Sequence, residues 1–201
     1  MRHKDIVRGI IICLVVLFIA FCVMLATPAK AYEGERITTA KQDALHNAAD
    51  ILRSVGYAED SEVIKALQAE WWREQEDLDI IAKVIQHEAD PEWCEWEHSV
   101  AVGVVVCNRV KSPHFPNMVK EVVAAPGQYL ESYTRNFSGT SRLAYEAAKA
   151  ALDGDHDVPS DCYWQDNKVH GVSVWKSFVC ETPYGFRSTT YICRGIPGVD
   201  G

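Results

Sequence analysis

The fold of this chain is decided by two neighbouring stretches, residues 77–89, which read DLDIIAKVIQHEA, and residues 97–110, which read EHSVAVGVVVCNRV. The first stretch places apolar side chains at the spacing of one helical face, at Leu78, Ile81 and Ile85. The second stretch is apolar almost throughout, which is typical of a helix buried on all sides. Together they predict a helical core.

The limits of these two helices can be read from their flanking residues. Asp77 is a good N-cap residue, so we expect the first helix to begin there and to run directly into Glu88. The second helix is expected to end at Lys111-Ser112-Pro113, because proline cannot continue a helix. A short polar segment, 89–96, separates the two.

The remaining sequence predicts smaller elements around this core. Residues 32–76 contain two amphipathic helices, which we interpret as a helical spacer or cap rather than as a separate wall-binding module. The main domain, 77–201, should end in a small β or extended portion. The fold class is therefore mainly α (α+β). The smaller elements are expected at 39–55 and 61–74 (accessory helices), 118–124 (a short segment), 141–152 (a helix ended by Gly154), and 162–165 and 189–193 (short strands).

The N-terminus has the features of an export segment. Three basic residues precede an apolar run from Gly9 to Thr27, and Ala29 and Ala31 form an A-x-A cleavage pattern. Residues 1–31 are therefore expected to be a signal peptide or, if uncleaved, an N-terminal membrane anchor. In both cases the remainder is secreted or held in the cell envelope.

The charge of the chain excludes some classes of partner. Its 28 acidic and 20 basic residues give a net charge of −8, and only Asp5 of the acidic residues lies in the export segment. Such an acidic surface offers no cationic stripe to a phosphate backbone, and it would be repelled by an anionic lipid surface. We therefore expect no nucleic-acid partner, and membrane association only through the N-terminus.

Five cysteines follow the export segment. Because five is an odd number, at least one of them must remain outside any disulfide within the chain. Two disulfides would suit a protein outside the cytoplasm, but the spacing does not assign the partners. Cys107 is the residue that we expect to stay a thiol, because it lies in the apolar run of the second helix. The five are Cys94, Cys107, Cys162, Cys180 and Cys193.

Four ordered blocks resemble the spore-cortex-lytic type of bacterial cell-wall hydrolase. They are Ile80 to Ala89, Val100 to Val110, Phe115-Pro116-Asn117 and Pro126-Gly127-Gln128-Tyr129. The resemblance extends from about Leu78 to Cys193. It implies a helical, lysozyme-like catalytic fold and an enzyme that cleaves the glycan strands of peptidoglycan.

The same resemblance implies that Glu88, the glutamate of the Glu-Ala pair, is the catalytic acid. Partial burial at the end of an apolar helix would favour this role, because burial raises the pKa of a carboxyl group. From the pattern alone, Glu88 would instead be an ordinary solvated residue at a helix terminus.

The segment after Glu88 departs from the family pattern. Members usually have an x-Gly-Glu segment there, whereas this chain reads DPEWCEWE from Asp90 to Glu97, about two residues longer. A second carboxylate could therefore be Glu92, Glu95 or Glu97. Cys94 within this segment could be tethered to another cysteine and so fix the groove edge beside Glu88.

Two reactions suit a glutamate in this role. In lytic transglycosylation the 6-hydroxyl of muramic acid attacks internally, and one glutamate serves first as acid and then as base. In hydrolysis a second carboxylate activates water or attacks the sugar. The family resemblance and the uncertain second carboxylate favour transglycosylation. A degenerate member that binds glycan or a protein partner without cutting is the alternative from another class.

The candidate substrate-binding residues are polar or aromatic residues in matching segments, Gln128, Tyr129, Tyr163 and Trp164. Each has a structural alternative, since Gln128 could cap a helix and the three aromatic residues could pack in the core. In the second helix, Asn108 is expected to organise hydrogen bonds rather than to touch substrate.

Other chemistries fit the sequence poorly. The cluster His87, Glu88, Cys94 and His98 lacks the spacing of a metal site, so we expect no metal and no cofactor. A cysteine peptidase using Cys94 or Cys107 with His170 has no supporting flanking pattern. Peptidoglycan glycan strands are the expected partner.

Overall fold

The computed structural model describes residues 37–129, 134 and 139–200, and it divides into two compact units, Met1–Glu76 and Asp77–Gly201. The predicted export segment lies outside the described residues. Within the described ranges, no helix is long and apolar enough to cross a membrane.

The first unit is a pair of helices, α2 (Ala40–Ser54) and the beginning of α3 (Glu62–Glu88). Thr39 caps α2 through a capping box with Gln42, and its hydroxyl also donates to Glu74 at 3.1 Å. Lys41 forms ion pairs with Glu70 and Glu74. Polar contacts therefore connect the start of α2 to α3 within this unit.

The prediction of a helix start at Asp77 is wrong. The helix α3 is continuous over 27 residues, so Asp77 lies within it and is not its N-cap. N-cap preference is only a local tendency, and residues 74–78 contain no glycine or proline that would interrupt the helix. The end at Glu88 is as predicted.

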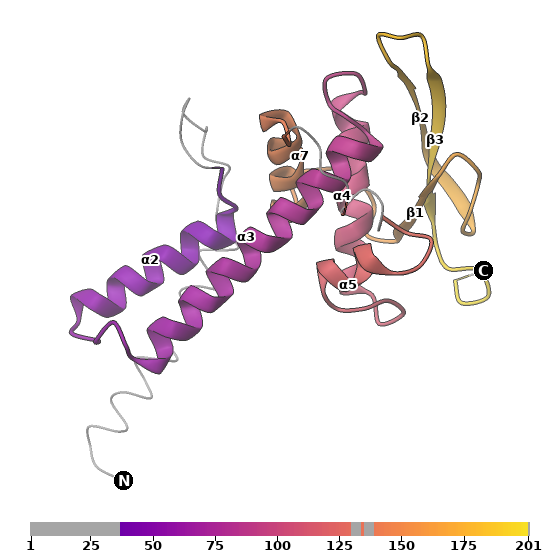
Figure 1. Cartoon of the computed structure of the whole chain (residues 1–201). Coiled ribbons are helices and arrows are strands. Elements are labelled where there is room, and N and C mark those ends of the chain that lie inside the picture. The colour runs from indigo at the N-terminus through magenta and orange to yellow at the C-terminus, as the bar shows by residue number, and fades with distance from the viewer. Residues whose placement is uncertain (1–36, 130–133, 135–138, 201) are drawn as a thin grey trace. The chain divides into compact units, whose positions relative to one another are not determined.

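Among the residues that the structure describes, the second unit contains the end of α3, the helices α4, α5 and α7, and a three-stranded sheet (Figure 1). Ser141 caps α7 by accepting from the backbone N–H of Ala144, and Gly154 ends it with a φ of 79°. The mainly helical α+β class is confirmed. The elements are α4 (Trp96–Lys111), α5 (Val119–Ala124), α7 (Arg142–Asp153), β1 (Cys162–Asp166), β2 (Ser173–Glu181) and β3 (Arg187–Arg194).

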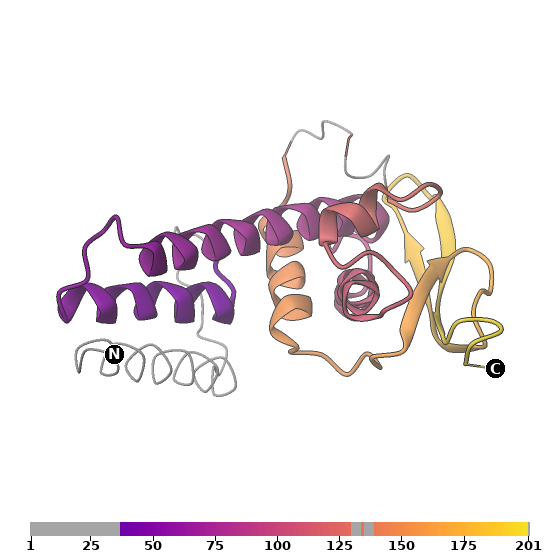
Figure 2. The ribbon, with the colours of Figure 1, turned by 90° about the horizontal axis from the view of Figure 1, so that it is seen from below.

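Helix α4 forms the centre of the second unit, with α7 and the sheet on opposite sides of it (Figure 2). Its residues from His98 to Arg109 are all buried. Gly103 permits the closest approach, because a Cβ added there would lie 2.9 Å from the Cβ of Ala151 and 3.1 Å from atoms of Ile81 and Ile85. The buried helix predicted from residues 97–110 is thus confirmed, and α3 and α7 pack on it without a gap.

The sheet is antiparallel, in the order β1-β3-β2. Strand β2 pairs with β3 from Arg187 to Arg194, but β1 pairs with β3 only from Tyr191 to Arg194. The buried side chains of Phe178 and Ile192 belong to the core. The sequence predicted β1 and β3 but did not locate β2.

Candidate active site

A groove of about 350 Å³ lies where the end of α3 meets the loop before residue 130 and the sheet. Glu88 is the residue that α3 contributes, and the others are mainly amides and hydroxyls. The lining residues are Glu88, Gly127, Gln128, Tyr129, Gln165, Asp166, Asn167, Ser188, Thr189 and Thr190. The groove is therefore polar and contains two carboxylates, a composition suited to a ligand rich in hydroxyl and amide groups.

The backbone that follows Glu88 is anchored to α4. The carbonyl of the next residue, Ala89, accepts a hydrogen bond of 2.6 Å from the hydroxyl of Ser99 in α4. The Glu88 carboxylate lies 3.0 Å from Nδ1 of His87, and its side chain is 28% exposed. Glu88 is thus neither fully buried nor fully solvated, so a ligand in the groove can reach it.

His98 is a buried imidazole at the start of α4, near Glu88. It stacks on Phe178 with a centroid distance of 4.9 Å, and neither ring nitrogen has a hydrogen-bond partner among the described residues. Burial lowers the pKa of His98 to about 4, although the negative charge of Glu88 opposes this shift. At neutral pH the imidazole is therefore uncharged.

Arg109 organises the side of the groove that carries Gln128 and Tyr129. Its Nε donates to the carbonyl of Tyr163 at 2.6 Å, and its guanidinium also donates to Oε1 of Gln128. The Tyr129 hydroxyl donates to Oε1 of Gln165 at 3.0 Å. One buried cation of α4 thereby connects the loop and strand β1, both of which contribute lining residues.

The pKa of the Tyr129 phenol depends on the charges around the groove. Burial raises the pKa of its phenol to about 12. The charge of Arg109 opposes this rise, while Glu88 and Asp166 add to it. Both groove carboxylates are therefore close enough to Tyr129 to influence its ionisation.

Tyr163 and Trp164 do not line the groove. Both pack around Phe115, at ring-centroid distances of 5.6 and 6.1 Å respectively, and the guanidinium of Arg109 lies 5.4 Å from the Trp164 ring. Their aromatic rings therefore belong to a structural cluster. Asn108 organises hydrogen bonds, as predicted, because its amide donates to the carbonyls of Pro159 and Cys162.

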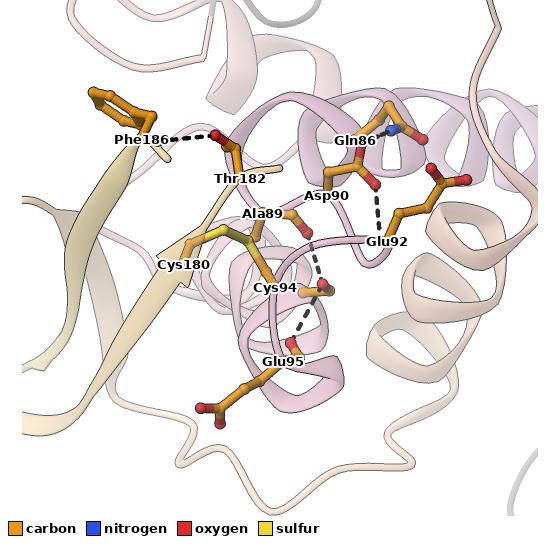
Figure 3. The surroundings of a disulfide bond; sticks show 10 residues. Gln86, Ala89, Asp90, Glu92, Cys94, Glu95, Cys180, Thr182 and Phe186 are labelled. Carbon is orange, nitrogen blue, oxygen red and sulfur yellow. Dashed lines mark hydrogen bonds between the residues drawn. A yellow bond between two sulfur atoms is a disulfide. The ribbon is translucent and has the colours of Figure 1, made fainter. Parts of the chain in front are cut away.

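The three glutamates suggested as second carboxylates do not line the groove either. Glu97 pairs with Lys176 of β2. The carboxylates of Glu92 and Glu95 point in opposite directions from the loop after α3 (Figure 3). Hydrogen bonds from the backbone N–H groups of Glu92 and Cys94 to Asp90 fix this loop.

Asp166 is the groove carboxylate that the sequence did not reveal. It ends β1, and its side chain accepts from the backbone N–H of Asn167 and lies 2.8 Å from Nε2 of His170. The only local signal was an acidic residue directly after a short aromatic strand. Its position beside Glu88 depends on strand pairing between segments far apart in sequence.

A disulfide joins Cys94 of the loop to Cys180 of β2 (Figure 3). Cys180 is opposite Ser188 in the β2–β3 register, and Ser188 lines the groove. The tether predicted for Cys94 is thus confirmed, and it holds the loop after Glu88 against the strand pair that carries this groove edge. Cys107 is a buried thiol, as expected.

The structure also shows the positions of the two candidate cysteines and of the possible metal ligands. Cys94 is bonded to Cys180 and Cys107 is buried in α4, so neither is placed as a nucleophile. Within the described ranges, no three His, Cys, Asp or Glu side chains gather as metal ligands would.

Comparison with known proteins identifies one family. Residues 95–183 match the family model described as Cell Wall Hydrolase. The match includes Gln128, Tyr129 and Asp166 and begins shortly after Glu88. It confirms the predicted family resemblance over this segment, which is shorter than the expected stretch from Leu78 to Cys193. No curated protein and no solved structure matches the chain.

Proposed function

Because residues 95–183 match the cell wall hydrolases, we propose that this chain is an exported enzyme that cleaves peptidoglycan glycan strands, with Glu88 as the general acid. The observation that carries the proposal is the position of Glu88, which the last turn of α3 presents to a polar groove. Gln128, Tyr129 and the hydroxyls of β3 surround it, and these groups can hydrogen-bond to sugar hydroxyls.

For the reaction we propose lytic transglycosylation beside muramic acid. Glu88 donates its proton to the glycosidic oxygen as the bond to the anomeric carbon breaks. The resulting carboxylate then removes the proton of the muramic acid 6-hydroxyl, whose oxygen attacks the anomeric carbon. The product is a 1,6-anhydro sugar, no water is consumed, and Glu88 regains its proton.

Gln128 and Arg109 have supporting roles in this scheme. Arg109 donates to the amide oxygen of Gln128, which leaves the two N–H donors of that amide for the substrate. Arg109 is 3% exposed, so it acts as a positioning residue and not as a ligand of the glycan.

Asp166 favours a second candidate reaction, hydrolysis. A carboxylate in the same groove as Glu88 could activate water, and the separation of the two groups would then determine the stereochemistry. The Asp166 carboxylate is already engaged, because it accepts from the backbone N–H of Asn167 and contacts Nε2 of His170, whereas transglycosylation needs only Glu88. We therefore place transglycosylation first.

The experiment is incubation of the purified full chain with peptidoglycan, followed by mass spectrometry of the released fragments. Transglycosylation yields anhydro-muropeptides, whereas hydrolysis yields reducing ends. Glu88→Gln should abolish either product with folding intact. Asp166→Asn should preserve anhydro products but would remove hydrolytic ones.

The same assay tests the alternative of a degenerate binder. If the wild-type chain releases no fragment but still sediments with wall material, the enzyme proposal is wrong and glycan binding remains. The proposed location is tested separately, by following the full chain in cell fractions and determining its mature N-terminus.

A further inference from the structure

His87 and Glu88 are consecutive residues in the last turn of α3, and their side chains meet. Nδ1 of His87 lies 3.0 Å from Oε1 of Glu88. The two side chains are 25% and 28% exposed, so both are largely covered, and Glu88 lines the groove. The proposed reaction gives Glu88 a role but leaves His87 without one.

Three other titratable groups belong to the surroundings of Glu88. Asp166 of β1 and Tyr129 of the loop have hydrogen-bond partners of their own, at 2.8 and 3.0 Å respectively. The neutral imidazole of His98, in α4, makes no hydrogen bond to any described residue. His87 is therefore the imidazole that is placed to act directly on the Glu88 carboxyl group.

The protonation state of Glu88 restricts the form that this contact can take. An ionised carboxylate only accepts, so while Glu88 is ionised the contact requires a proton on Nδ1 of His87. When Glu88 is protonated, two arrangements satisfy the 3.0 Å contact. In the first, Oε1 carries the proton and donates it to Nδ1. In the second, Nδ1–H still donates to Oε1, and the proton of the carboxyl group is on Oε2.

Only the second arrangement suits a general acid. A proton on Oε1 would be held in the hydrogen bond to His87 and would have to leave that bond before its transfer to the glycosidic oxygen. With the proton on Oε2, donation from Nδ1 to Oε1 also stabilises the negative charge that the transfer leaves on the carboxylate. Oε2 can then take up the proton that the reaction releases in its second step.

We propose that His87 is a positioning residue, which donates from Nδ1 to Oε1 throughout the reaction and so makes Oε2 of Glu88 the oxygen that gives up and regains the proton. No proton passes through His87, because its Nδ1–H is retained. The inference rests on the proposed function for the role of Glu88. It holds for transglycosylation and for hydrolysis alike, since both begin with proton donation by Glu88.

The key comparison is between His87→Asn and His87→Gln. An asparagine amide can place an N–H where Nδ1 stands, because both nitrogens are attached to Cγ, whereas the glutamine amide is one bond further from the backbone. Glutamine is the better helix former of the two. A purely structural role would therefore rank His87→Gln above His87→Asn, and the proposed role predicts the opposite order. His87→Leu removes the donor altogether.

Each variant of the full chain is assayed on soluble peptidoglycan strands. We expect His87→Leu and His87→Gln to lower kcat about 10- to 100-fold with little change in KM, as the loss of a hydrogen bond to a charged group would. His87→Asn should keep most of the wild-type kcat. Equal losses in His87→Asn and His87→Gln, with folding verified by circular dichroism, overturn the inference. In the inactive Glu88→Gln chain, His87→Leu should leave strand binding unchanged. Weaker binding would make His87 a ligand of the glycan and would also overturn it.

A second measurement does not depend on turnover. Nitrogen-15 resonances of the labelled full chain show which ring nitrogen of the neutral His87 carries the proton, and the resonances of this ring are assigned by their loss in His87→Asn. We expect the proton on Nδ1, and Glu88→Leu should lower the population of this tautomer because it removes the acceptor. A proton on Nε2 in the wild type overturns the inference. A wild-type chain that cuts nothing would refute the proposed function, whereas a proton on Nδ1 would still support the hydrogen bond assigned to His87.

Discussion

The disulfide between Cys94 and Cys180 gives the most quantitative prediction. The two residues are 86 positions apart, so reduction releases a long loop in the unfolded chain. The chain-entropy relation for a loop of this length gives a stabilisation of about 4.6 kcal/mol. Because typical domains are stable by about 5–15 kcal/mol, the double variant Cys94→Ser/Cys180→Ser should be markedly less stable.

Urea denaturation of the full chain, with and without a thiol reductant, measures this effect. The reductant should lower the midpoint of the wild type towards that of the double variant, and it should leave the double variant unchanged. Cys107→Ala is the control for altered packing, since it should still respond to reductant as the wild type does.

The same variant tests the role of the disulfide at the groove. Cys180 is opposite Ser188, so loss of the tether should loosen this groove edge and raise KM more than it lowers kcat. The measurement is made at a temperature where the variant is still folded. Equal midpoints for the wild type with and without reductant would refute the reasoning, as would alkylation of both cysteines in the native protein.

Three further predictions concern α4. The folded pKa of His98, about 4, lies below its ordinary value of 6.5, so the unfolded state binds the extra proton first. The contribution of neutral His98 to the free energy of unfolding should therefore be fully present above pH 6.5 and should fall by about 3 kcal/mol as the pH is lowered to 4. Urea denaturation at a series of pH values should show a smaller pH dependence of this free energy for His98→Leu. Gly103→Ala should lower the free energy of unfolding of the second unit, because an overpacking cost of about 1–3 kcal/mol exceeds the gain of at most about 1 kcal/mol in helix propensity. A higher melting temperature of this variant would contradict the prediction. Arg109→Lys should lower kcat/KM several-fold, because lysine cannot donate to Tyr163 and Gln128 in the same planar geometry, and unaltered kinetics would show that the guanidinium does not position the groove.

The helices could be predicted because their signals are local. The apolar spacing before Glu88, the Ser141 cap and the Gly154 stop each depend on a few adjacent residues. Asp77 shows the limit of such signals. Its N-cap preference was outweighed by a continuous helical sequence on both sides, because capping is only one contribution among many along a long helix.

The groove depends on contacts that no local pattern contains. Asp166 lines the same groove as Glu88 because β1 pairs with the far end of β3, and Cys94 is bonded to Cys180, which lies 86 positions away in the sequence. The role proposed for Glu88 needed the family resemblance, because a glutamate at the end of a helix is usually an ordinary surface residue. The family pattern places a second glutamate in the loop after Glu88, so the sequence indicated that loop and not Asp166.

Two buried polar residues at the end of α4 connect the segments that form one side of the groove. Asn108 and Arg109 are buried polar residues, and each needs hydrogen-bond partners that the apolar helix cannot supply. The Asn108 amide donates to the carbonyls of Pro159 and Cys162, and these bonds fix the start of β1. The Arg109 guanidinium donates to the carbonyl of Tyr163 and to Oε1 of Gln128, and so connects β1 to the loop. The groove opposite Glu88 is therefore built by satisfying two side chains in the core, so a substitution at either one should disturb substrate binding without touching the substrate.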